Sequence, residues 1–149
     1  MKKITYIPII DELSSFILNR ARAFKKRRLF KNKNIHSSVR IGNDCLIDKN
    51  VYISEGTYIG AGAQLYSGDK SKVEIGKFCA IGYNVHIKAR THDLKQPTSN
   101  GFIKHKRTEK NISICDFVWI GDNVFIKEGI TIESHAIIAA NSVVVRDVK

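Results

Sequence analysis

Aliphatic residues recur at every sixth position along most of the chain after residue 34. A period of six fits neither an amphipathic helix nor a simple alternating strand. Such a repeat, kept over many cycles, indicates a solenoid of short strands separated by turns. We expect the aliphatic side chains to point into a narrow core, with neighbouring coils about 4.8 Å apart. All fifteen positions of the series hold Ile, Leu or Val: Ile35, Ile41, Ile47, Ile53, Ile59, Leu65, Ile75, Ile81, Ile87, Ile114, Ile120, Ile126, Ile132, Ile138 and Val144.

A mostly small or β-branched residue follows four positions after each aliphatic one, as at Thr57, Cys79 and Thr91. We expect these residues to pack inside the coil near its bends. Glycine often follows the aliphatic residue directly, which suits an unusual dihedral angle or a close approach of two backbones. These glycines are Gly42, Gly60, Gly76, Gly82 and Gly121.

The period breaks twice. Four extra residues lie between Leu65 and Ile75, around the sequence SGDKSK, and after Ile87 the pattern resumes only at Ile114. The second break predicts a loop excursion over residues 93–111. A loop of that length in a compact domain is usually either functional or disordered.

Three stretches of the chain, IGAGAQ, IGKFCAIGYNV and VWIGDNVFIKEGITI, resemble the hexapeptide-repeat acyltransferases. The resemblance covers about residues 35–148 and is nearest to the sugar and polysaccharide O-acetyltransferases and the xenobiotic acetyltransferases. It implies an all-β fold, a left-handed parallel β-helix with three hexads per triangular coil, which is an exception to the usual right-handed crossover. The expected acyltransferase domain is 35–149. The resemblance also implies acetyl-CoA as co-substrate and a homotrimer with active sites between subunits.

His92 stands where the excursion begins, in the sequence HIKARTHDLKQP. Members of the resembled family carry their catalytic histidine where the long loop leaves its coil, so the resemblance assigns His92 as the general base. An alcohol needs a base with a pKa near 7 to attack a thioester, and histidine supplies one. His86 lies one hexad earlier and therefore on another face, while His105 retains a supporting role as an alternative. The group that orients His92 stays open among a backbone carbonyl, Asp93, Glu74 and Gln64.

The C-terminal repeats resemble the coils along which the family binds coenzyme A. Carried over by position, Trp119 would flank the pantetheine arm, and Asp122 and Ala140 would offer main-chain contacts. Val145 and Arg146 would lie near the nucleotide phosphates, and a guanidinium suits that role. The family pattern normally continues beyond this point, whereas this sequence stops at Lys149. We expect either a short protein whose last coil a partner covers or a truncated form.

The N-terminal segment carries most of the positive charge. Residues 1–40 hold eleven Lys and Arg against two acidic residues, and the rest of the chain is nearly balanced. Apolar residues follow helical spacing from Ile9 to Phe24, so we expect a basic helical cap over residues 1–34 that covers the open end of the solenoid. Weak contact of this helix with an anionic membrane surface is a second interpretation. Nucleic acid is not expected as a partner, because aromatic residues do not alternate with the basic cluster.

The cysteines and the lengths of the apolar runs indicate the cellular compartment of the protein. Cys45, Cys79 and Cys115 form no CxxC pair, and the first two occupy small-residue positions, so we expect buried reduced thiols. Acidic residues interrupt the N-terminal apolar run and nothing approaches eighteen apolar residues, so we expect neither a signal peptide nor a membrane span. These features predict a cytoplasmic protein, with the inner membrane surface as the place of any peripheral contact.

The favoured function is acetyl transfer to a sugar hydroxyl, on a surface polysaccharide or its precursor. A metal lyase of the carbonic anhydrase type would need converging histidines, usually two of them five residues apart, and no such pair exists. No metal is therefore expected. An antibiotic acetyltransferase and a non-catalytic hexapeptide-repeat subunit stay open as alternatives.

Overall fold

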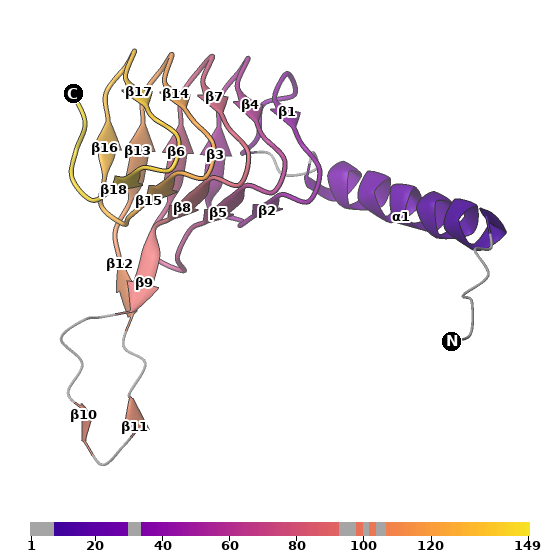
Figure 1. Ribbon diagram of the computed structural model, residues 1–149. Coiled ribbons are helices and arrows are strands. Elements are labelled where there is room, and N and C mark those ends of the chain that lie inside the picture. Colours follow the sequence, from indigo (N-terminus) through magenta and orange to yellow (C-terminus); the bar gives the residue numbers. More distant parts are fainter. Residues whose placement is uncertain (1–7, 30–33, 93–97, 100–101, 104–106) are drawn as a thin grey trace.

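The computed structural model describes residues 8–29, 34–92, 98–99, 102–103 and 107–149. Helix α1 (Pro8–Leu29) precedes a parallel β-solenoid whose coils stack side by side (Figure 1). Successive strands along the chain belong in turn to three sheets, which we call A, B and C, so each full coil contributes one strand to each sheet. The six-residue repeat therefore produces the predicted parallel β-helix.

Each of the three sheets consists of four or five strands from successive coils. Sheet A holds β3 (Val51–Ile53), β6 (Val73–Ile75), β13 (Ile112–Ile114) and β16 (Thr131–Ile132). Sheet B holds β1 (Arg40–Ile41), β4 (Tyr58–Ile59), β7 (Ala80–Ile81), β14 (Trp119–Ile120) and β17 (Ile137–Ile138). Sheet C holds β2 (Leu46–Ile47), β5 (Gln64–Tyr66), β8 (His86–Lys88), β15 (Phe125–Ile126) and β18 (Val143–Val144). Every pair of neighbours in these sheets is parallel.

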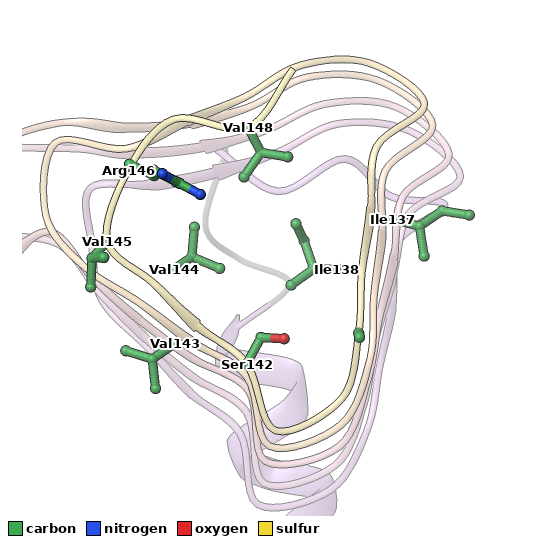
Figure 2. A pocket seen from close by; sticks show the side chains of 9 residues that line it. Ile137, Ile138, Ser142, Val143, Val144, Val145, Arg146 and Val148 are labelled. Atoms are coloured by element: carbon green, nitrogen blue, oxygen red, sulfur yellow. The ribbon is translucent and has the colours of Figure 1, made fainter.

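The winding is left-handed, as the resemblance implied. Figure 2 looks along the solenoid with the C-terminal coil in front. From Ile137 through Ser142 to Val148 the chain runs clockwise while it approaches the viewer, which is left-handed winding.

The core is the column of aliphatic side chains that the repeat predicted. Fourteen of the fifteen positions are buried, and Ile47 is partly buried against the same cluster. The sequence reasoning missed Val73 and Ile112, which are also fully buried and lie opposite each other in sheet A. They belong to the two irregular segments, where each stands two residues before an aliphatic position of the repeat.

The glycines of the repeat are explained by close approach and not by dihedral angle. A Cβ added to Gly121 would lie 2.6 Å from the backbone nitrogen of Ala140 in the next coil. Left-handed backbone occurs instead at the bends, with φ of 53° at Asn84 and 57° at Asn123, where a short polar side chain tolerates it.

Two expectations about the excursion need correction, its bounds and the position of Thr91. The excursion was expected over residues 93–111, but the chain already leaves the coil after the buried Ala89 and rejoins it at Ile112. Thr91 was expected inside the coil and lies instead on β9 (Arg90–His92), where it pairs with Thr108 of β12 (Arg107–Glu109). Ala89, and not Thr91, continues the coil, because the backbone N–H of Ala89 donates a hydrogen bond to the carbonyl of Tyr66.

The N-terminal helix forms, but its described side chains do not cover the end of the solenoid. Figure 1 shows α1 projecting away from the first coil instead of lying across it. Residues 11–21 are all exposed. Among the described side chains of α1, Arg22 forms an ion pair with Asp44 of the first coil. A helical cap over residues 1–34 stays a prediction.

Candidate functional site

A two-stranded arm leaves the solenoid at the end of β8. Strands β9 and β12 pair in antiparallel register, and β10 (Thr98–Ser99) pairs with β11 (Phe102–Ile103) farther along the arm (Figure 1). The arm emerges at the corner between sheets C and A, because β8 lies in sheet C and β13, the next strand of the solenoid, lies in sheet A. This corner is therefore the place where a mobile substrate could meet both the arm and the coils.

His92 is the last residue of β9 and is exposed. It lies directly opposite Arg107, and Arg90 lies opposite Glu109. Paired residues of an antiparallel ribbon, and residues two apart on one strand, project to the same face. One face of the arm therefore carries His92 and Arg107 together with the opposed pair Arg90 and Glu109. The sequence reasoning singled out neither arginine.

The base of the arm is fastened to the first irregular segment. The backbone N–H of Lys70 donates a 2.8 Å hydrogen bond to Glu109 Oε2, and the backbone N–H of Lys72 donates a 3.0 Å bond to the side-chain oxygen of Asn111. The buried Ser71 hydroxyl donates a 3.2 Å bond to the carbonyl of Ala89. The two register breaks thus form one unit, in which the short insertion supports the long arm.

Backbone donors also set the charge of the Glu109 carboxylate. The N–H of Lys70 is the main cause that lowers its pKa, with smaller contributions from the N–H groups of Asp69 and Ser71 and from the nearby Arg90. The carboxylate is therefore ionised at neutral pH and bound by a concave run of amides. The signal available in the sequence was an acidic residue shortly before the repeat resumes at Ile114.

Other candidates for the site lie elsewhere. Burial and the neighbouring Lys88 lower the pKa of His86, which stands on sheet C between Gln64 and Phe125. The spacing of His86 and His92 predicted two faces of the coil, but His92 lies on the arm and only His86 lies on a face of the solenoid. Glu74, on sheet A, forms a 2.7 Å ion pair with Lys72. Asp93 and His105, also named from the sequence, fall outside the described residues.

Three of the five residues expected to bind coenzyme A lie close together on the solenoid. Trp119 stands on the outer face of sheet B, 57% exposed, beside Ile137 of the next coil. Asp122 occupies the following bend, and its backbone carbonyl accepts a 2.9 Å bond from the N–H of Asn141, the residue after Ala140. Both Asp122 and Ala140 are exposed, so this bend lies open to solvent next to the tryptophan face.

The other two residues lie at the next corner of the triangle. Val145 and Arg146 follow β18 of sheet C and help to line an open hollow of about 440 Å³ at the C-terminal coil. Figure 2 shows Val145 directed outward and Arg146 directed across the end of the coil toward its axis. The structure therefore separates the predicted residues into a group around Trp119 and a group beyond sheet C.

The described residues offer no metal site. Within them, no group of three or more His, Cys, Asp or Glu side chains could hold a metal ion. The described site offers His92, Arg90, Arg107 and Glu109 on the arm and the exposed Trp119 on the solenoid.

Comparison with known proteins agrees with this fold. A family profile described as "Bacterial transferase hexapeptide (six repeats)" matches residues 111–146, and one described as "Hexapeptide repeat of succinyl-transferase" matches residues 38–68. A solved hexapeptide-repeat acetyltransferase from Vibrio cholerae O1 biovar eltor, complexed with acetyl coenzyme A, superimposes with a TM-score of 0.66. The two proteins are 29% identical, and the match covers 76% of this chain and 60% of the other. The chain is therefore similar to hexapeptide-repeat acetyltransferases in both its repeats and its fold.

Two further proteins named as acetyltransferases are similar to this chain. The polySia specific acetyltransferase NeuO is 32% identical with a TM-score of 0.55, over 77% of this chain and 51% of NeuO. A protein of Schizosaccharomyces pombe, assigned to the acetyltransferases by name only, is 34% identical over 80 residues, which are 54% of this chain and 37% of that protein. This chain thus spans less than two thirds of the length of each relative.

Proposed function

We propose that this protein transfers an acetyl group from acetyl-CoA to a hydroxyl group of a sugar, on a surface polysaccharide or its precursor. The observation that carries the proposal is the place of His92, exposed at the end of β9 where the arm leaves the coil. Relatives support the reaction class: the Vibrio cholerae acetyltransferase was solved with acetyl coenzyme A, and NeuO is named for polysialic acid.

In the proposed reaction, His92 acts as a general base. Its neutral imidazole takes the proton of the acceptor hydroxyl while the oxygen attacks the thioester carbonyl. The tetrahedral intermediate then collapses, the carbon–sulfur bond breaks, and the imidazolium returns the proton to the departing thiolate. Since no covalent enzyme intermediate forms, the site requires no nucleophilic serine or cysteine.

The surface around Trp119 is suited to the pantetheine arm of acetyl-CoA. The indole lies exposed beside the exposed Ile137, so apolar surface is available to the arm. The bend at Asp122 and Ala140 is exposed too, and its backbone groups are within reach of a chain lying on that face. Arg146 offers a cation for the nucleotide phosphates of acetyl-CoA. It lies beyond sheet C, away from the surface around Trp119, so it is the least supported member of the predicted set.

The charges on the arm favour an acidic acceptor. Arg90 and Arg107 share a face with His92, and Arg107 is exposed. Arg90 already faces the Glu109 carboxylate. The Arg107 guanidinium opposite the base would bind the carboxylate of a uronic or sialic acid residue by charge-assisted hydrogen bonds. We therefore expect an acidic glycan to be a better acceptor than a neutral sugar of the same size.

The proposed assembly is a homotrimer with the active sites between subunits. Exposed hydrophobic side chains on the outer faces of the solenoid support it, because Trp119, Ile137 and Val143 lie open to solvent on a single chain. Analytical ultracentrifugation tests this part of the proposal: a species of three chains is expected, and a stable monomer would contradict it.

The function is tested by two measurements on the same sample. Trp119 is the only tryptophan of the chain, so its fluorescence reports acetyl-CoA binding directly. Release of free thiol from acetyl-CoA, measured with neutral and acidic oligosaccharides and with antibiotic acceptors, then identifies the acceptor class. Turnover with an acidic oligosaccharide is the expected result, turnover with antibiotics alone would make the protein a xenobiotic acetyltransferase, and absence of acetyl-CoA binding would indicate a non-catalytic subunit.

A further inference from the structure

Helix α1 exposes an apolar stripe. Leu13, Phe16 and Ile17 are 58%, 57% and 59% exposed. Their spacing of three and four residues places them on one face of the helix. An exposed stripe of this kind marks a surface that contacts something other than water.

The solenoid of the same chain is not what covers the stripe. Arg22 contacts the first coil through a 3.3 Å ion pair between its guanidinium and the carboxylate of Asp44. At 3.6 residues per turn, Arg22 lies on the side of the helix opposite Leu13, the first residue of the stripe. The polar side of α1 therefore faces the first coil at this contact, and the apolar stripe faces away.

The helix also carries many basic residues. Its sequence ends in a run of Lys and Arg, KKRRL, and residues 1–40 hold eleven basic residues against two acidic ones. Arg20 lies within the stripe, and its guanidinium carbon sits 5.4 Å from the centre of the Phe16 ring. An arginine there can lay its apolar stem along the ring and direct its charge to the rim of the stripe.

We propose that α1 binds the surface of an anionic lipid bilayer, with Leu13, Phe16 and Ile17 inserted and the basic residues on the headgroups. A helix with an apolar face, basic flanks and low mean hydropathy is suited to lie in the interface. Anionic lipids would also neutralise the charge of the segment. The helix is not a spanning segment, since among the described helices none is long and apolar enough to cross a membrane.

A second copy of the helix fits the stripe less well. Packing two α1 helices through this face would bring their basic ends and their Arg20 side chains close together when the helices run parallel, and like charges repel. A bilayer offers the opposite charge together with an apolar layer. The proposal does not depend on acetyl transfer, because lipid binding is measured without substrates.

The test is co-sedimentation of the full chain with vesicles of phosphatidylcholine alone and of phosphatidylcholine mixed with phosphatidylglycerol. We expect binding to the mixed vesicles that falls as salt is added, and little binding to the neutral ones. The variant Leu13→Ser/Phe16→Ser/Ile17→Ser should lower the partition coefficient on mixed vesicles at least about tenfold. Leu18→Ser is the matched control, because Leu18 is 48% exposed and lies on the opposite side of the helix.

Three results would overturn the proposal. The first is equal binding to neutral and anionic vesicles, or none to either. The second is an effect of Leu18→Ser as large as that of the triple variant, which would mean that the stripe is not the contact. The third is a loss of oligomeric mass in the triple variant without any change in vesicle binding, which would identify a second copy of the chain as the occupant.

Discussion

Replacing Thr57 with Val should destabilise the solenoid by about 3 kcal/mol. The Thr57 side chain is fully buried and joins two coils. Its hydroxyl donates a 2.7 Å hydrogen bond to the carbonyl of Gly76 and accepts a 3.0 Å bond from the backbone N–H of Cys79. Valine keeps the shape but removes the oxygen, so both backbone groups lose their partner.

The magnitude follows from the two groups left without that partner. A buried donor or acceptor without a bond costs about 1–3 kcal/mol. The N–H of Cys79 is the more deeply buried of the two and should incur most of that cost, whereas the carbonyl of Gly76 is only partly buried and can recover some hydration. The sum is about 3 kcal/mol, which corresponds to a fall in Tm of roughly 6–12 °C for a chain of this size.

Urea denaturation followed by circular dichroism measures the change in the free energy of unfolding. Thr131→Val is the control, because Thr131 is an exposed strand residue of sheet A, and its substitution should stay within about 0.5 kcal/mol of the wild type. A Thr57→Val variant as stable as this control would refute the reasoning, since the two hydrogen bonds would then contribute nothing to the stacking of the coils.

Three other outcomes are expected. Gly121→Ala should destabilise the protein by about 1–3 kcal/mol or more in thermal denaturation, because its Cβ would meet backbone of the next coil that cannot turn aside. The folded pKa of Glu109 is lowered, so the stability it contributes is present above its unfolded pKa and is lost as the pH falls through the folded value. Acid titration should therefore loosen the arm in the wild type, as seen by proteolysis, while Glu109→Gln is already loose at neutral pH. Burial raises the pKa of Cys79, so a thiol reagent should label the partly exposed Cys115 first in the folded protein, and equal labelling of Cys79 would contradict the structure.

The solenoid could be predicted because one physical requirement repeats. Each coil needs an aliphatic residue at the same inward position, so the period alone located the core, and only the partly buried Ile47 departs from full burial. The period could not specify what happens where it stops. Thr91 kept the spacing of an inward residue, yet the backbone of Ala89 bonds to Tyr66 and the next three residues turn outward into the arm.

The place of the arm was predictable in part for the same reason, because the sequence displays the break of the register directly. The role of His92 at that break stays a prediction. The fastening of Glu109 to Lys70 joins residues 39 positions apart, in two segments that both lack the repeat, so no pattern connects them. The orientation of α1 was likewise hidden, because helical spacing predicts an apolar face without saying what that face contacts.

The central claim is that His92 is the general base of an acetyl transfer. The most direct measurement is thiol release from acetyl-CoA with the best acceptor, for the wild type, His92→Ala and His86→Ala, with acetyl-CoA binding followed by Trp119 fluorescence. The account predicts that His92→Ala loses about 10²–10⁴-fold in kcat while binding is retained, and that His86→Ala stays close to the wild type. Full turnover in His92→Ala would contradict it, and so would an equal loss in both variants.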